Sequence, residues 1–300
     1  MTKANEIFGI IYGPAKRGKT VAAIRSFPTG FFISPKGGML SSNWLGWEPK
    51  SIEATGFDQI MNILSKPHNH PAIIIDDFSI IADAELGKLK KTHRGWSAFD
   101  VFNAKVYELR DCAREANCHV ILIMHEQPPR EVKKEGGGKY IPGAPLIPGW
   151  QLPEKLPALA DFVARVVHTD DFPGPWPFVF QTGPDQNYIT GDRLAITPPL
   201  SPMNLGETLR AAGYTIPRPE PLLWMEDAVE KISQLLVQQM QKEEPNFQPI
   251  LKAAATKLTA KVSDKRHIRW ALLDSFDRAY LKIHSTNLVD DFIESFDVAI

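Results

Sequence analysis

Cysteine is scarce in this chain, which has only two among its 300 residues. Cys112 and Cys118 lie in a stretch that we expect to pass from a helix into a strand, and their spacing is unlike that of a metal site. A disulfide scaffold or a zinc cluster is therefore disfavoured. We interpret both cysteines as small buried side chains of a protein in a reducing compartment.

The sequence also lacks an excess of charge of one sign and any long apolar run. The formal net charge is −1, so no global field favours a nucleic acid or a membrane, and polyanion binding must come from local patches. No apolar run approaches the roughly 20 residues that span a bilayer. The first residues lack the apolar segment of a secretion signal. We therefore expect a cytoplasmic protein with no membrane partner.

One short motif is present in full. The chain fits G-x-x-x-x-G-K-[ST] between an apolar run, residues 7–12, and a helix-like stretch, residues 21–24. In a P-loop the glycines let several backbone N–H groups point at phosphate oxygens, and the helix N-terminus adds partial positive charge. Lys19 would reach the β- and γ-phosphates, and the Thr20 hydroxyl would hold Mg²⁺. The predicted ATP-binding residues are Gly13, Pro14, Ala15, Lys16, Arg17, Gly18, Lys19 and Thr20.

The first third of the chain alternates apolar strands with helices. Helical stretches separate four expected strands, at residues 6–12, 31–34, 72–75 and 120–124. That alternation is typical of a parallel sheet covered by helices on both faces, and ligands bind such sheets at the carboxyl ends of the strands. Gly13, Asp76 and His125 all follow strand ends, which predicts one shared site.

Three polar residues at these ends are catalytic candidates, and each has a simpler interpretation. Asp76 follows four apolar residues, as a Walker B aspartate does, and would hold Mg²⁺, although it could instead cap the next helix. Asp77 would either polarise the attacking water or cap that helix. His125 would touch the γ-phosphate or the water, or be a buried core histidine. We favour the metal role for Asp76 and the phosphate role for His125.

The second half of the chain is rich in proline and loses the alternating pattern. Residues 127–151 show no periodicity, so we expect a long functional or disordered loop there. Strand candidates at residues 162–168 and 176–181 predict late antiparallel hairpins. We predict a core at residues 1–215, a linker and amphipathic helix at 216–245, and a C-terminal helical module at 246–300.

These features together resemble the RecA-like P-loop ATPases of bacteriophages, a group that includes recombination and single-strand annealing proteins. The resemblance covers about residues 5–213 and rests on the P-loop, on the strands that end in Asp76 and His125, and more weakly on residues 202–213. It implies an α/β fold, a RecA-like P-loop core with a mostly parallel sheet, helices on both faces, late hairpins and a small C-terminal helical module.

The resemblance also implies roles for matching residues. Lys19 and Thr20 would take the nucleotide and Mg²⁺, and Asp76 would take the metal. His125 would sense the γ-phosphate. Arg193 matches the arginine of a Lys-Asp-Arg motif, whose basic groups can reach the nucleotide of a neighbouring subunit.

The chain departs from the family pattern in two places. Gly191 stands where a lysine is expected in the motif before Arg193. Family members often carry a glutamate after the second strand, where this chain has residues 34–38 without an acid. Hydrolysis would therefore depend on Asp77 or be slow, and a nucleotide-gated binding protein stays an alternative.

Two stretches match the loops that contact single-stranded DNA in RecA-like proteins. They are residues 88–96 and residues 130–150, which follow the strands ending in Asp76 and His125. Cations would neutralise phosphates and aromatic rings would stack on bases, whereas solvated charged loops are the alternative. The predicted DNA-binding residues are Lys88, Lys90, Lys91, Arg94, Trp96, Arg130, Lys133, Lys134, Lys139 and Tyr140.

The leading functional hypothesis is an ATP- and Mg²⁺-dependent ATPase that acts on single-stranded DNA in phage recombination or replication. It would assemble as a homo-oligomer in the cytoplasm of an infected bacterial cell, with a single-strand-binding or replication protein as a further partner. The alternatives are a helicase loader or other protein-remodelling ATPase, and a nucleotide-binding assembly protein with little hydrolysis. Stimulation of ATP turnover by DNA, by a protein, or by neither would separate them.

Overall fold

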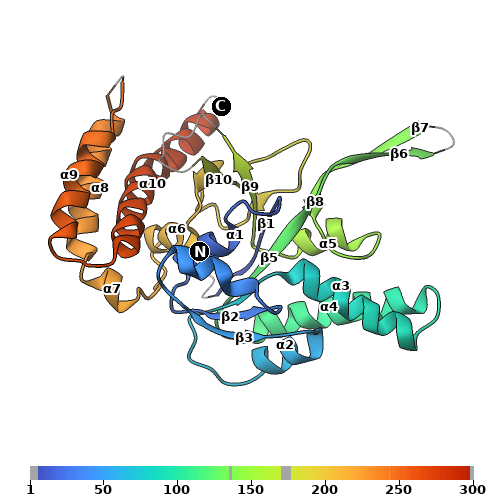
Figure 1. Cartoon of the computed structure of the whole chain (residues 1–300). Helices are drawn as coiled ribbons and strands as arrows, with labels where there is room; N and C mark the ends of the chain where they lie inside the picture. The colour runs from blue at the N-terminus through green and yellow to red at the C-terminus, as the bar shows by residue number, and fades with distance from the viewer. Residues whose placement is uncertain (1–5, 135–136, 170–176, 243, 298–300) are drawn as a thin grey trace.

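The computed structural model describes residues 6–134, 137–169, 177–242 and 244–297 (Figure 1). One large sheet forms its centre, and in these residues its strand order is β12-β10-β9-β1-β5-β4-β2-β3, with β11 beside β9 and β8 beside β5. The strands are β1 (Phe8–Gly13), β2 (Phe31–Ser34), β3 (Lys50–Glu53), β4 (Ala72–Ile75), β5 (His119–Gln127), β8 (Ala144–Pro145), β9 (Phe162–His168), β10 (Phe178–Gln181), β11 (Gly191–Asp192) and β12 (Leu200–Pro202).

The described strands from β9 to β3 run parallel, whereas β10 and β12 are antiparallel additions at one edge. The central strand β4 is apolar along its length because both of its faces are buried, and Ile73, Ile74 and Ile75 are each 0% exposed. Because β5 lies between β1 and β4, the carboxyl ends of these strands meet at one edge. The predicted α/β architecture, a mostly parallel sheet with late antiparallel strands, is confirmed.

Helices cover both faces of the sheet. They are α1 (Lys19–Ser26), α2 (Phe57–Leu64), α3 (Phe78–Thr92), α4 (Ser97–Glu115), α5 (Leu152–Ala158), α6 (Leu205–Ala211), α7 (Glu220–Leu223), α8 (Glu226–Met240), α9 (Gln248–Thr259) and α10 (Lys265–Asp297), with the 3-10 helix η1 (Gly38–Trp44). Successive β1 residues belong to two different cores, since Ile11 packs with α1 and the C-terminal helices while Ile10 and Tyr12 pack with α2, α3 and α4.

The stretch after β5 corrects one prediction. In place of a long loop at residues 127–151, the chain forms a two-stranded antiparallel ribbon, β6 (Arg130–Lys134) with β7 (Gly137–Ile141), which projects away from the sheet (Figure 1). The prediction of a segment without secondary structure is wrong. Backbone hydrogen bonds between the two short strands stabilise the ribbon. Because these bonds do not depend on the side chains, the ribbon forms without an alternating apolar pattern in the sequence.

Helix α3 corrects a second prediction. The family resemblance predicts a loop at residues 88–96, but α3 continues to Thr92 and residues 93–96 alone connect it to α4. Leu86 and Leu89 are buried and extend the apolar stripe of the helix, so packing keeps its last turns helical. Three of the predicted DNA-binding cations therefore lie on a helix and not in a loop: Lys88, Lys90 and Lys91.

The C-terminal helices α8, α9 and α10 pack together on one side of the sheet (Figure 1). Val229 and Leu236 of α8 share one core cluster with Trp270 and Phe276 of α10 and with Ala23 of α1. The C-terminal helices therefore pack against the helix that follows the P-loop. The domain limits near residues 215 and 245 stay predictions. In the described part of the chain, no helix is both long and apolar enough to cross a bilayer.

Candidate functional site

The P-loop connects β1 to α1 at the carboxyl edge of the sheet. Gly13 ends β1 level with His125 of β5, and Gly18 immediately precedes α1. Lys16 and Gly18 have φ values of 60° and 79°, left-handed conformations that wrap the chain around the start of the helix. The first N–H groups of a helix have no partner inside the helix, so the loop and the first turn of α1 can bind phosphate oxygens.

Lys19 is buried at the first position of α1, with 7% of its surface exposed. Its Nζ donates hydrogen bonds to the carbonyl oxygens of Gly13 at 3.0 Å and Pro14 at 2.8 Å. Burial lowers the pKa of Lys19, and the charges of Asp77 and Asp76 oppose that shift. The ammonium group thus lies over the loop, where it can exchange two carbonyl contacts for phosphate oxygens.

Asp76 follows β4 and is 4% exposed. Burial raises the pKa of its carboxyl to about 7, although a hydrogen bond from the Thr20 hydroxyl lowers it. Its Oδ2 is a buried atom with no hydrogen-bond partner among the described residues. An orphaned carboxylate oxygen beside a hydroxyl is the oxygen chemistry that Mg²⁺ prefers, with water and phosphate oxygens as its other ligands. Thr20 and Asp76 therefore fit a Mg²⁺ ion.

Asp77 caps the helix that follows it and also contacts His125, whereas its role in polarising the attacking water stays a prediction. Its Oδ1 accepts a hydrogen bond from the backbone N–H of Ser79 at 2.9 Å, so it caps the N-terminus of α3. Its Oδ2 lies 2.5 Å from Nε2 of His125. Burial raises the pKa of Asp77, and the positive charge that His125 can carry opposes the shift. The His125 side chain is 31% exposed, so it is not a plain core histidine.

A second polar group, which the sequence analysis missed, lies where β5 and β9 flank β1. The Glu126 carboxylate accepts a hydrogen bond from Nε of Arg165 at 2.6 Å. The Arg165 guanidinium stacks on Tyr188, 3.3 Å from the ring centre, and the Tyr12 hydroxyl donates to the carbonyl of Ile189 at 2.8 Å. Burial raises the pKa of Tyr12. Only the strand order could have shown that these residues meet.

Arg193 lies away from the phosphate-binding loop. Asp192 pairs with Phe162 at the amino end of β9, whereas the P-loop follows the carboxyl end of β1. The Arg193 guanidinium donates to the carbonyl oxygen of Ala158 at 2.5 Å. The Asp192 carboxylate accepts backbone hydrogen bonds from the next residues, so this motif forms a turn. A role of Arg193 at a neighbouring subunit's nucleotide stays a prediction.

The first predicted DNA-binding stretch spans the end of α3 and the connection to α4. Lys88 donates to the carbonyl oxygen of Thr55 at 2.6 Å, so its ammonium group is engaged within the fold. The Lys90 ammonium lies 5.2 Å from the centre of the Phe99 ring. Trp96 is 80% exposed at the connection, and the exposed cations nearby are Lys91 and Arg94.

The second predicted stretch is the ribbon of β6 and β7. The Arg130 guanidinium lies 5.8 Å from the centre of the Trp150 ring, which is 65% exposed. Tyr140 is 45% exposed and its hydroxyl donates to Asn187 Oδ1 at 2.7 Å. The remaining predicted residues belong to the paired strands of the ribbon, and only their backbone is described: Lys133, Lys134 and Lys139.

Comparison with known proteins adds little to this geometry. No protein-family model and no curated protein matches the chain. Among solved structures, the chain is similar to a KaiC-like protein from the hyperthermophilic archaeon Pyrococcus horikoshii OT3. The identity is 12% and the TM-score 0.36, over 58% of this chain and 77% of that one. So remote a similarity carries no argument, and the fold assignment rests on the sheet order and the P-loop.

Proposed function

We propose that the protein is a Mg²⁺-dependent ATPase that acts on single-stranded DNA as a homo-oligomer, in phage recombination or replication. One observation carries the ATPase proposal, namely the grouping of a P-loop lysine, a hydroxyl–carboxylate pair and a carboxylate–imidazole pair at adjoining strand ends. These groups are Lys19, Thr20 with Asp76, and Asp77 with His125. They match the three needs of phosphoryl transfer to water, which are phosphate binding, metal binding and positioning of the water.

The phosphate-binding residues act through charge and position. The loop N–H groups and the Lys19 ammonium would hold the β- and γ-phosphates of ATP. Thr20 and Asp76 would hold Mg²⁺, which when bound neutralises charge on the phosphate oxygens. The orphaned Oδ2 of Asp76 would gain a partner in this way.

Asp77 is the residue best placed to accept a proton from the attacking water. The His125 contact at 2.5 Å and the cap on α3 hold its carboxylate in one orientation. Burial raises its pKa, and a carboxylate with a raised pKa is a stronger base. This assignment gives the chain a water-activating acid although residues 34–38 contain none.

Exposed aromatic rings beside cations support single-stranded DNA as the substrate. Trp96 follows α3, and Trp150 lies against Arg130 at the base of the ribbon. Each base stacked on such a ring contributes roughly 1–3 kcal/mol without regard to sequence. Both the ribbon and the connection between α3 and α4 extend beyond the sheet, where a strand of DNA can reach them (Figure 1).

The experiment that tests the proposal measures phosphate release from ATP with and without single-stranded DNA, alongside calorimetry of Mg-ATP binding. We expect heat on binding and faster turnover with DNA. Absence of binding heat would contradict the nucleotide site itself. Turnover stimulated by a protein partner and not by DNA would replace the DNA-dependent role with a protein-remodelling one.

Reversing three charges on the ribbon is expected to weaken DNA binding. In the variant Lys133→Glu, Lys134→Glu and Lys139→Glu, fewer phosphates are neutralised and fewer counterions are released. The slope of log K against log salt should flatten by about 2, since each phosphate contact contributes about 0.7 on a single strand. Fluorescence anisotropy across salt concentrations measures both affinity and slope.

A matched control reverses the same amount of charge elsewhere, at three exposed lysines away from the ribbon: Lys36, Lys50 and Lys66. That variant should bind DNA nearly as the parent does, apart from a small uniform effect of net charge. Equal losses in both variants, or none in the ribbon variant, would remove the ribbon from the DNA-binding surface.

A further inference from the structure

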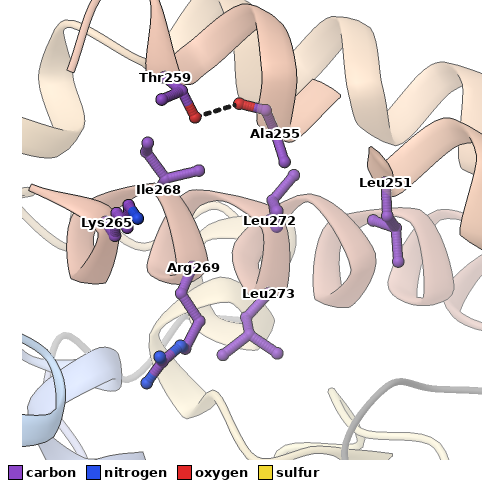
Figure 2. A pocket seen from close by; sticks show the side chains of 8 residues that line it. All are labelled: Leu251, Ala255, Thr259, Lys265, Ile268, Arg269, Leu272 and Leu273. Atoms are coloured by element: carbon purple, nitrogen blue, oxygen red, sulfur yellow. Dashed lines mark hydrogen bonds between the residues drawn. The ribbon is translucent and has the colours of Figure 1, made fainter. Parts of the chain in front are cut away.

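A groove of about 360 Å³ lies between α9 and α10, apart from the nucleotide site (Figure 2). Its walls are mainly apolar. Leu251 and Ala255 come from α9, and Ile268, Leu272 and Leu273 come from α10. Since Leu251, Ala255 and Leu272 are only half-buried, the groove presents apolar surface that water covers in an isolated chain.

The mouth of this groove is positively charged. Lys265 and Arg269 of α10 line it, and both are exposed. The Arg269 guanidinium lies 4.9 Å from the centre of the Trp44 ring, at the end of η1. An occupant of the groove should therefore combine an apolar group with negative charge.

The same chain presents such a group at the junction of α7 and α8. Leu223 is 55% exposed and Trp224 is 80% exposed, although both are large apolar residues. Leu222 and Met225 on either side are 1% and 2% exposed, so the backbone of the junction is anchored in the core. The indole ring is thus held outward on a fixed base, which lowers the entropy lost when it binds.

We infer that the groove between α9 and α10 receives Trp224 from a second copy of this chain. Charge complementarity supports this occupant, because the exposed Glu220 and Asp227 flank the tryptophan while Lys265 and Arg269 flank the groove. An apolar ring would fill the floor, and the acidic and basic residues would meet at the rim. A tryptophan at the centre of a contact is the side chain that most often dominates its energy.

The position of the groove links this contact to the nucleotide site. Leu273 also borders a small cavity whose other walls include Gly18, Ala22 and Arg25 of the P-loop and α1. A second copy seated in the groove would lie beside the helix that carries Lys19. The inference rests on the homo-oligomer proposed above and names its contact surface.

The contact area sets the expected strength. Two exposed apolar side chains bury a few hundred Å², since a large aromatic ring buries about 150–250 Å². Stable interfaces bury about 1,200–2,000 Å² in total, so this contact should be reversible and dependent on protein concentration.

Sedimentation velocity without nucleotide or DNA tests the inference. The mass of the sedimenting species of the parent protein should rise above that of the 33.6 kDa monomer as the protein concentration increases. Trp224→Ala should remain a monomer at the same concentrations. Trp96→Ala is the matched control, because Trp96 is also 80% exposed and lies in a different part of the fold, and it should associate as the parent does.

A complementation experiment tests the pairing of ring and groove directly. Ala255→Trp fills the groove. Arg269→Glu reverses the charge at the rim of the groove and leaves the apolar floor open. Each should be monomeric alone. Trp224→Ala keeps an intact groove, whereas Arg269→Glu and Ala255→Trp each keep the tryptophan. When either groove variant is mixed with Trp224→Ala, one protein supplies the ring and the other the groove, so both mixtures should form a dimer.

Three results would overturn the inference. They are a parent that stays monomeric at concentrations up to about 1 mM, the weak end of the affinity scale, a Trp224→Ala protein that associates like the parent, and mixtures that form no dimer. Calorimetry of Mg-ATP on Trp224→Ala separates the two proposals. The variant should bind nucleotide as the parent does, so loss of association with retained binding supports the inference. Absence of nucleotide binding in the parent would contradict the ATPase alone.

Discussion

Replacing Lys19 with alanine is expected to lower ATP turnover by roughly 10²–10³-fold, the usual loss when one donor to a developing negative charge is removed. Lys19 is a buried cation of the P-loop, and its Nζ lies where it can exchange the carbonyls of Gly13 and Pro14 for phosphate oxygens. The fold should persist because neither hydrophobic core includes Lys19. Phosphate release, Mg-ATP calorimetry and the thermal midpoint measure these effects.

Lys66→Ala is the matched control for this experiment. Lys66 is exposed just after α2 and belongs to none of the proposed binding surfaces. It should leave turnover and the thermal midpoint unchanged, since isolated surface charges contribute little. Turnover that survives in Lys19→Ala, or that falls equally in both variants, would contradict the assignment of the P-loop as the site of ATP binding.

The fold was predictable wherever one physical rule decided the outcome. The apolar runs at residues 72–75 and 120–124, which alternate with helices, are typical of strands buried on both faces of a parallel sheet, and they form β4 and most of β5. The P-loop was predictable because its glycines have a backbone role that other residues fill poorly. The edge strand β3, Lys50–Glu53, carried no such signal, because its residues are exposed.

The errors occurred where pairing or packing overrode local composition. Residues 88–92 look like a charged loop, yet they continue α3, because Leu86 and Leu89 are buried on one face of that helix. Residues 130–134 and 137–141 are rich in charge and glycine, yet they form β6 and β7 because each strand satisfies the other's backbone groups.

The sequence predicted which strand ends carry the polar residues of the site, but it did not predict which of those residues contact one another. Asp77 and His125 were each foreseen as polar residues after strands, but the 2.5 Å contact between them depends on β4 lying beside β5. The Glu126–Arg165 pair required the order of β5, β1 and β9, which no single segment encodes.

Arg25→Met is expected to lower the free energy of unfolding by about 3–5 kcal/mol, the range for breaking a buried ion pair from one side. Arg25 lies on α1 and is 5% exposed. Its Nη2 lies 3.1 Å from Oδ1 of Asp274 and also contacts Oδ2 of Asp277, both on α10. Methionine preserves the apolar stem, so the loss should report a core in which Asp277 has lost Arg25 and Asp274 keeps only its longer ion pair with Arg218, at 3.4 Å. Urea unfolding measures it.

The loss should depend on pH with a sign set by Asp277. Burial raises the pKa of its carboxyl from 3.8 to about 6, although Arg25 lowers it. A carboxyl whose pKa is higher in the folded state binds protons more tightly there, so its contribution to stability falls as pH rises through about 4 to 6. Without Arg25 the protonated form is favoured further. The variant should therefore regain part of its stability at about pH 5 relative to pH 8.

Arg266→Met separates this buried network from an ordinary surface pair. Arg266 lies on α10, the helix that carries Asp274 and Asp277, where it is exposed and pairs with Asp264 at 2.8 Å. Water and salt screen that pair, so its loss should leave the unfolding midpoint nearly unchanged at either pH. If Arg25→Met behaved like Arg266→Met, the ion pairs would not join α1 to α10, and apolar packing alone would hold the P-loop helix against the C-terminal helices.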